Sequence, residues 1–127
     1  MSRPALNILH FDDDPDDAIQ VLACLEDSGE FTAQVTTVEQ LTDGLRRLHA
    51  QRFDLVLVKL DLPDSQGLGT FERLSREAPD LPALVLAPRE DPQLAAQVLL
   101  RGAQDFIVVP TLNPASLSRA VLFAIQR

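Results

Sequence analysis

The sequence predicts one α/β domain in which parallel β-strands alternate with α-helices. Short apolar segments alternate with longer amphipathic segments along the whole chain. Two of the apolar segments, 53–58 and 82–87, are apolar on both alternate faces, as strands are when helices cover both sides of a sheet. Helices between such strands make right-handed crossovers and a parallel sheet. The chain has 127 residues, which suits a single domain with its own core.

The expected strands are short runs rich in apolar and β-branched residues. The second of them alternates polar with apolar residues, which places it towards an edge of the sheet. The ranges of the five runs are 6–11, 31–37, 53–58, 82–87 and 105–109.

The expected helices follow the strands and carry start signals. Asp14, Asp91 and Asn113 each precede a proline, which is the pattern of an N-cap residue followed by proline at the first helical position. Thr37 and Gln40 have the spacing of a capping box, so we expect the second helix to begin after Thr37. The five helical segments begin at residues 15, 38, 67, 92 and 114.

Composition restricts the partners and the compartment. The net charge is −8 and the isoelectric point is about 4.5, so we expect neither nucleic acid nor an anionic membrane as a partner. The single cysteine, Cys24, excludes an internal disulfide and favours a reducing cytoplasm. The last expected helix has no stop signal, which leaves open that residues 1–127 are the N-terminal part of a longer protein with an output domain.

Candidate functional residues stand at the carboxyl ends of the strands, where ligands bind in sheets of this kind. Asp12 and Asp13 follow the first expected strand, and Lys59 stands near the end of the third. Lys59 is the only lysine of the chain and interrupts an otherwise apolar run. His10, within the first strand, is expected to be a packed core residue, because no second histidine or cysteine lies near it in sequence.

Three stretches of the chain resemble the receiver domains of response regulators, in the order and spacing of that family. HFDDDPDD at 10–17 is similar to the acidic motif of the first strand, and DLVLVKLDLPDSQGL at 54–68 to the third strand and its loop. RGAQDFIVVP at 101–110 is similar to the end of the fourth helix and the fifth strand. The resemblance implies a flavodoxin-like fold with strand order 2-1-3-4-5 and a cytoplasmic role in two-component signalling or a phosphorelay.

The resemblance carries over only in part at the phosphorylation site. Asp12 and Asp13 match the two acids that help to hold Mg²⁺ in the family. Lys59 matches the aspartate that accepts the phosphoryl group, so that acceptor is absent. A protonated amine is no nucleophile and repels a cation, so we expect Mg²⁺ to bind weakly or not at all. The implied protein is a pseudo-receiver, without catalytic activity or cofactor, that acts through protein contacts.

At three further positions of the family's site, this chain lacks the polar or charged group that the family has. Ala87 matches the serine or threonine that reads the phosphoryl oxygens at the end of the fourth strand. Val109 matches the lysine at the end of the fifth strand, and Phe106 matches the switch aromatic but lacks a hydroxyl group.

Lys59 is expected to replace the metal, with its ammonium reaching Asp12 and Asp13 and neutralising acids that otherwise repel each other. The alternative is that Lys59 bends into water and leaves the acids solvated.

Two other functions stay open. A phosphorylatable receiver can use Asp61 as a displaced acceptor, and a flavodoxin-like enzyme can use Asp12 and Asp13. Flavin binding is disfavoured, because the chain has no tryptophan or tyrosine to stack on the ring.

The expected partner surface consists of the fourth helix, the fifth strand and the fifth helix, which the family uses for dimers and output domains. The fourth helix has more apolar residues than one buried stripe needs, which indicates a protein partner or a homodimer. These residues are Leu94, Val98, Leu99 and Leu100.

Overall fold

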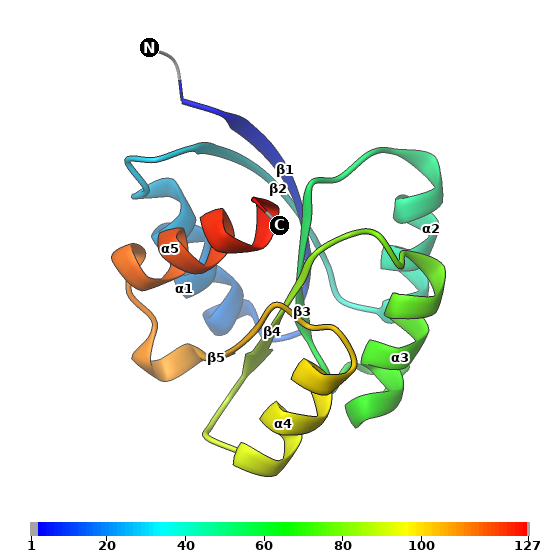
Figure 1. Cartoon of the computed structure of the whole chain (residues 1–127). Coiled ribbons are helices and arrows are strands. Elements are labelled where there is room, and N and C mark those ends of the chain that lie inside the picture. The colour runs from blue at the N-terminus through cyan, green and yellow to red at the C-terminus, as the bar shows by residue number, and fades with distance from the viewer. Residues whose placement is uncertain (1–2, 127) are drawn as a thin grey trace.

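The computed structural model describes residues 3–126 and has a five-stranded parallel sheet between two layers of helices (Figure 1). Strands and helices alternate, as predicted. No helix within these residues combines the length and the apolar character needed to cross a membrane. The strands are β1 (Ala5–Phe11), β2 (Thr32–Val38), β3 (Leu55–Lys59), β4 (Ala83–Ala87) and β5 (Asp105–Val108). The helices are α1 (Pro15–Glu26), α2 (Leu41–Ala50), α3 (Gly67–Glu77), α4 (Pro92–Leu100), the 3₁₀ turn η1 (Val109–Thr111) and α5 (Pro114–Ile125).

The strand order is β2-β1-β3-β4-β5, and all neighbouring strands are parallel. This is the order that the resemblance implied, and it confirms the edge position predicted for the second strand. Every residue of β4 is buried, as are the first four of β3, because helices cover both faces of these central strands.

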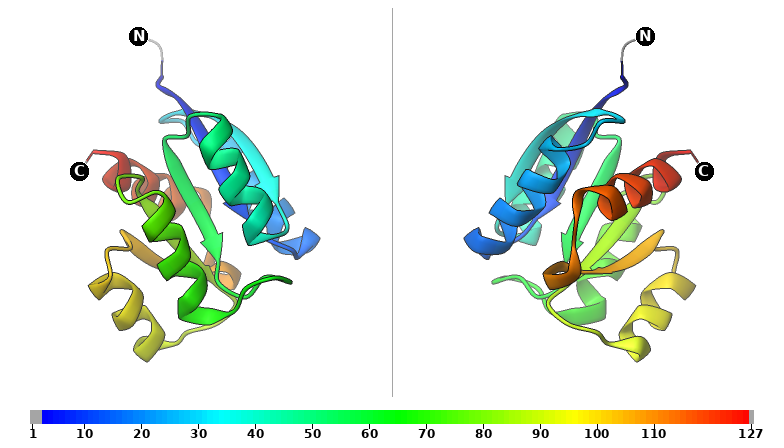
Figure 2. Two further views of the ribbon diagram at one scale, coloured as in Figure 1. Left: turned by 90° about the vertical axis from the view of Figure 1, so that its right-hand side faces the viewer. Right: turned by 90° about the vertical axis from the view of Figure 1, so that its left-hand side faces the viewer.

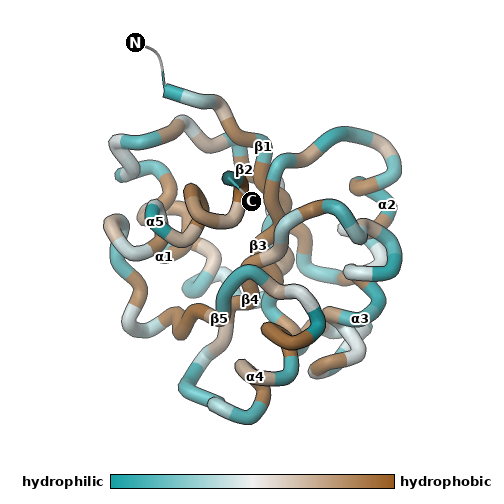
Figure 3. Tube along the Cα trace, in the orientation of Figure 1, coloured by the Kyte–Doolittle hydropathy of each residue, from teal (hydrophilic) through white to brown (hydrophobic). Residues whose placement is uncertain are grey.

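Helices α1 and α5 cover one face of the sheet, and α2, α3 and α4 cover the other (Figures 1 and 2). Alternate residues of each strand therefore enter two separate cores. Val56 and Val58 pack on the side of α2, α3 and α4, whereas Leu55 and Leu57 pack on the side of α1 and α5. Figure 3 shows the apolar residues gathered along the central strands, between the helical layers. Packing on both faces holds the carboxyl ends of the strands in place.

Three helices begin at the capping residues that the sequence predicts. The carboxylate of Asp14 accepts the backbone N–H of Asp16 at 2.9 Å, and Asp91 caps α4 in the same way. Asn113 and Ser116 form a reciprocal capping box at the start of α5. These bonds satisfy N–H groups that have no partner within the helix.

The prediction for the start of the second helix is wrong. Thr37 belongs to β2, and α2 begins at Leu41 after Gln40, whose side chain makes no cap hydrogen bond. The carboxylate of Asp64, in the loop after β3, accepts the backbone N–H groups of Leu41 at 2.7 Å and of Thr42 at 2.9 Å. The cap thus comes from a residue that is distant in sequence, which a local pattern does not reveal.

The apolar surplus predicted for the fourth helix is exposed. Val98 is buried under α4, whereas Leu99 and Leu100 on the same helix are exposed. Phe123 on α5 is exposed as well. These residues lie on the two helices that flank β5, the edge strand.

Candidate functional site

The ends of β1 and β3 bring an amine and two carboxylates together. The register of these strands pairs Phe11 with Val58, so one step further along both chains Asp12 comes beside Lys59. Asp13 follows in the loop that leads from β1 into α1. The three charged side chains therefore meet at the carboxyl edge of the sheet, as the sequence predicts.

Lys59 forms an ion pair with Asp13. Its Nζ lies 2.8 Å from Oδ1 of Asp13, and the two side chains are 21% and 32% exposed. Partial burial lowers the pKa of Lys59, but the hydrogen bond to Asp13 and the charges of Asp13, Asp12 and Asp14 outweigh it, so the pKa lies above its ordinary value. The ion pair expected with Asp13 is confirmed. Lys59 makes no hydrogen bond to Asp12 within the described residues, because the carboxylate of Asp12 faces elsewhere, but the charge of Asp12 still contributes to the raised pKa of Lys59.

Asp12 faces the protein interior. Its Oδ1 accepts the backbone N–H of Asp14 at 2.9 Å, and its Oδ2 lies 3.3 Å from Nε2 of His10. Both side chains are buried, and neither of these last two atoms makes a hydrogen bond within residues 3–126. On the other side of the ring, Nδ1 of His10 lies 3.5 Å from Oγ1 of Thr37. His10 is buried as predicted, but its contact with a carboxylate was not foreseen.

Ala87 and Val109 lie at the same edge, Phe106 lies two residues before the end of β5, and none of the three carries a charge or a hydroxyl group. Ala87 ends β4 and is buried. Val109 is 3% exposed and packs in the core on the side of α1 and α5, while its carbonyl oxygen accepts a hydrogen bond from Nε2 of Gln20 at 3.0 Å. Phe106, on β5, packs partly buried against the core on the side of α4. These three positions therefore offer no donor for a phosphoryl oxygen from their side chains.

The acids at the start of α1 are only partly neutralised. Partial burial raises the pKa of Asp17, and the charges of Asp14, Asp12 and Asp16 raise it further, while Lys59 acts in the opposite direction. The single ammonium group thus compensates part of a self-repelling cluster, and its removal would increase that repulsion.

The residues at this edge do not fit Mg²⁺, the ion that the resemblance implies. Mg²⁺ prefers octahedral oxygen ligands, several of them water molecules. Here an ammonium group lies against Asp13, and the oxygens of Asp12 face a backbone N–H and His10. In the part of the chain that the structure describes, no three His, Cys, Asp or Glu side chains are placed to hold a metal ion together. Weak Mg²⁺ binding in solution stays a prediction.

A comparison with known protein families identifies the family of this chain. The family model described as the response regulator receiver domain matches residues 8–121. The chain belongs to this family. As a receiver domain it has the acidic pair of the first strand and, at position 59, a lysine.

Curated relatives of the receiver domain are longer proteins. Virulence transcriptional regulatory protein PhoP of Salmonella typhimurium is 36% identical over 86 residues, which make up 68% of this chain and 37% of the relative. Two-component response regulator ARR10 of Arabidopsis thaliana is 29% identical over 105 residues, which make up 83% of this chain and 19% of the relative. The chain thus matches less than two fifths of the length of either relative.

Solved receiver domains have the same fold. The signal receiver domain of a signal transduction histidine kinase from Syntrophus aciditrophicus is 27% identical, with a TM-score of 0.75 over 95% of this chain and 90% of that one. A response regulator receiver domain protein from Clostridium thermocellum is 23% identical, with a TM-score of 0.81 over 96% and 95% of the two chains. The second likeness shows the fold alone.

Asp64, in the loop after β3, and Thr70, in α3, hold the loop of the receiver's site in place and were not predicted for that role. A small loss of solvation raises the pKa of the exposed residue Asp64, but hydrogen bonds from Thr42 and Leu41 outweigh it, so the pKa lies below its ordinary value. The buried hydroxyl group of Thr70 donates to the carbonyl oxygen of Leu60 at 2.6 Å and fixes the start of the same loop. The loop therefore joins the end of β3 to both α2 and α3.

Asp61, the predicted alternative acceptor, is exposed in the same loop. Its Oδ1 accepts the backbone N–H of Gly67 at 2.8 Å. Gly67 has a φ of 58°, which glycine adopts without strain. One oxygen of Asp61 thus supports the turn into α3.

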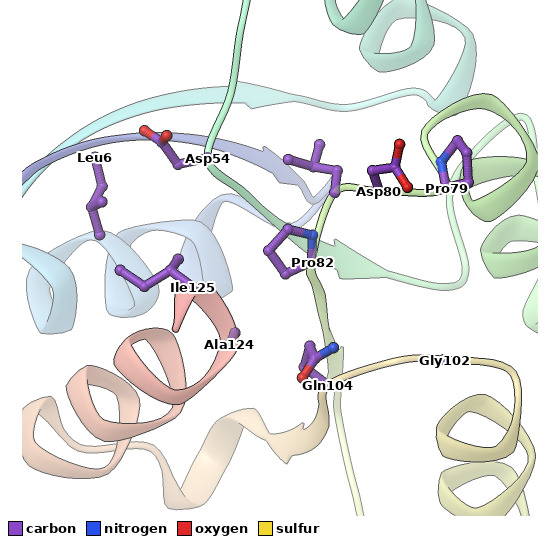
Figure 4. Close-up of a pocket in the computed structure, with 10 residues that line it drawn as sticks. Leu6, Asp54, Pro79, Asp80, Pro82, Gly102, Gln104, Ala124 and Ile125 are labelled. Atoms are coloured by element: carbon purple, nitrogen blue, oxygen red, sulfur yellow. The ribbon is translucent and has the colours of Figure 1, made fainter. Parts of the chain in front are cut away.

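A hollow of about 530 Å³ lies at the amino ends of the strands, on the edge of the sheet opposite to the ion pair. Figure 4 shows the carboxylates of Asp54 and Asp80 beside it, together with the apolar side chains of Leu6 and Ile125. Asp54 accepts the backbone N–H of Asn7 at 2.8 Å and so supports β1. Because this hollow lies at the far end of the strands from the ion pair, it forms no part of the candidate site.

Proposed function

We propose that this receiver domain is a pseudo-receiver that is not phosphorylated at position 59 and signals through contacts with other proteins. The observation that carries the proposal is the 2.8 Å ion pair between Lys59 and Asp13, at the place where the resemblance implies an acceptor carboxylate and a metal. A protonated amine has no electron pair with which to attack a phosphoryl group. The raised pKa of Lys59 keeps the amine protonated at neutral pH.

The proposed partner is a protein or an output domain that contacts α4, β5 and α5. Leu100 is 86% exposed, Phe123 62% and Leu99 44%, and large exposed apolar side chains of this kind favour a protein contact. A second copy of the chain is one candidate for that partner. The net charge of −8 disfavours nucleic acid or an anionic membrane for this domain by itself. The proposed location is the cytoplasm, where the free cysteine Cys24 would stay reduced.

A phosphorylatable receiver that uses Asp61 is the second candidate. The observation that favours it is an exposed carboxylate in the loop directly after β3, of which only one oxygen has a hydrogen bond within residues 3–126. This candidate predicts a covalent phosphoryl group on Asp61, whereas a pseudo-receiver has none.

Incubation with acetyl phosphate and Mg²⁺, followed by intact-protein mass measurement, tests the proposal. We expect no phosphoryl adduct, while a phosphorylatable receiver treated in parallel gains one. An adduct that the Asp61→Asn variant loses would establish the second candidate. Titration with beryllofluoride and Mg²⁺, followed by ¹H–¹⁵N NMR, is expected to leave the amide resonances of Asp12, Asp13 and Ala87 unshifted.

A further inference from the structure

A small apolar hollow opens beside Lys59, and we propose that it receives one aliphatic side chain carried by a basic segment of the partner protein. This inference rests on the proposed function, because it concerns a receiver whose partner binds without phosphorylation. The hollow measures about 110 Å³ and lies between the carboxyl ends of β3 and β4, the helix α4, and β5. Its apolar lining includes Leu60, Leu86, Ala87, Pro88, Leu94 and Phe106.

The hollow is apolar because of the residues that this chain has at its walls. Ala87 presents a methyl group, and Phe106 presents a ring without a hydroxyl group. The ammonium group of Lys59, on the rim, is paired with Asp13 at 2.8 Å. The carboxylate of Asp61, also on the rim, bonds to the backbone at the start of α3. A water molecule needs two to four polar partners to be held in such a space, so these walls favour an apolar group.

The volume of the hollow selects a side chain rather than a small-molecule ligand. Sites for drug-sized ligands measure roughly 300–1,000 Å³. An apolar cavity of roughly 150 Å³ accepts benzene. A space of about 110 Å³ therefore suits a single leucine, isoleucine or valine side chain. Anchors that fill a pocket at the centre of an interface contribute a large share of its affinity.

The charges around the hollow select a basic carrier for that side chain. The loop from β1 to α1 and the loop from β3 to α3 contain acids and no basic residue. The loop from β4 to α4 has Glu90 and Asp91 against Arg89. Lys59 is already paired with Asp13 and so contributes little to attracting an anion. A lysine or arginine next to the anchor meets complementary charge, whereas an acidic segment is repelled.

Selection from a random peptide library displayed on phage tests this inference on the full chain, without Mg²⁺ or a phosphoryl donor. We expect the recovered peptides to share one Leu, Ile or Val flanked by Lys or Arg, and their binding to weaken as salt is raised. Recovery of acidic peptides, or of no peptide above a bare surface, would overturn the inference.

Two variants test whether the selected peptides bind in the hollow. Ala87→Val fills it and Leu94→Asn places a polar, uncharged group in its wall, and each is expected to weaken peptide binding by about tenfold or more. Ile19→Asn makes the same kind of change at an exposed aliphatic residue on α1 and is expected to leave binding unchanged. A dispersed ¹H–¹⁵N NMR spectrum checks the fold, and Leu94→Asn decides alone where Ala87→Val does not fold. Equal binding by all three variants contradicts the inference.

The two proposals fail independently. Peptide binding here involves no phosphoryl group, so its failure leaves the mass measurement with acetyl phosphate untouched. Conversely, a phosphoryl adduct would overturn the pseudo-receiver while the selected peptides still map to the hollow.

Discussion

Nζ of Lys59 lies 2.8 Å from Oδ1 of Asp13, with the pair at the carboxyl end of β3. The ammonium group of Lys59 is a fixed part of the chain, whereas a metal ion binds and dissociates and a phosphoryl group is added and removed. Under the proposed function, the charge of the site is therefore constant, and the population of the signalling complex follows the concentration and affinity of the partner.

Replacing Lys59 with methionine keeps an apolar stem and removes the charge. We expect the free energy of unfolding to fall by roughly 1–2 kcal/mol, because Asp13 loses its hydrogen-bonded partner next to other acids. Urea denaturation followed by circular dichroism measures the change. In a double-mutant cycle with Asp13→Asn, the two effects are expected to be less than additive. Fully additive effects would show that the pair contributes nothing.

Lys59 also predicts a loss of stability at alkaline pH. Its pKa in the folded protein lies above the ordinary value of 10.5, so its contribution is complete below pH 10.5 and is lost as the pH rises through the folded-state pKa. The chain has no tyrosine and no second lysine. Burial, followed by the charge of Asp27, raises the pKa of Cys24. Cys24 therefore also lowers the stability of the fold as the pH rises above the ordinary thiol pKa of 9.0. The measurement therefore uses a Cys24→Ala background.

In that background, the free energy of unfolding of the lysine-containing protein is expected to fall more steeply above pH 10.5 than that of the Lys59→Met variant. Urea midpoints taken along a pH series give the comparison. Parallel curves for the two proteins would mean that Lys59 has the same pKa in the folded and unfolded chain.

Local patterns in the sequence account for most of the fold. Strands covered on both sides are continuous apolar runs, and three helices start at an acid or asparagine followed by proline, so both can be predicted without tertiary contacts. The position of Lys59 near the strand end and of Asp13 after β1 was enough to predict their meeting, because parallel strands end at one edge.

Contacts between distant segments account for what could not be predicted. The cap on α2 comes from Asp64, and only the weakness of Gln40 as a capping residue gave a signal that an acid was needed from elsewhere. The contact of His10 with Asp12 had a clearer signal, since residues two apart on a strand share a face. Lys59 was expected to reach both acids, but only Asp13 is in contact with its ammonium group, because Asp12 faces His10; the charge of Asp12 acts on Lys59 without a hydrogen bond.

Replacing Asp64 with asparagine is expected to lower the stability of the fold. The change weakens the cap on α2 and costs about 1 kcal/mol at neutral pH. Because the pKa of Asp64 is depressed in the folded state, its contribution is present above the ordinary value of 3.8 and is lost as the pH falls through the folded-state pKa. Urea midpoints of the two proteins should therefore converge in acid. Asp80→Asn, at an exposed aspartate in the loop before β4, should show no such difference.

Two helical glycines are expected to respond in opposite ways to alanine. A Cβ added at Gly44, in α2, would meet the ring of Phe11, whereas nothing lies within 4 Å of a Cβ at Gly69, in α3. Gly69→Ala should raise stability by up to about 1 kcal/mol through helix propensity. Gly44→Ala should lower it by roughly 1–3 kcal/mol, because overpacking against a buried ring exceeds that gain. Thermal melts of both variants test the packing of α2 on β1, and a stabilised Gly44→Ala would refute it.

Replacing Lys59 with aspartate returns a third carboxylate to Asp12 and Asp13. Without divalent cations this variant is expected to be less stable than the wild type, because three acids then meet without the ammonium group. Millimolar Mg²⁺ should raise its melting temperature, since an ion that binds the folded chain alone stabilises it by mass action. The wild-type melting temperature should not move.

Lys59→Asn is the matched control for that variant, because it removes the positive charge without adding a carboxylate. If loss of the ammonium group alone freed the acidic pair for the metal, Mg²⁺ would stabilise Lys59→Asn as strongly as Lys59→Asp. We expect a much smaller shift, because Asp12 still faces His10 and an octahedral ion would gain only Asp13 as an anionic ligand. Stabilisation of the wild type by Mg²⁺ would instead mean that the ion displaces Lys59 from Asp13, and a permanent ion pair would no longer explain the site.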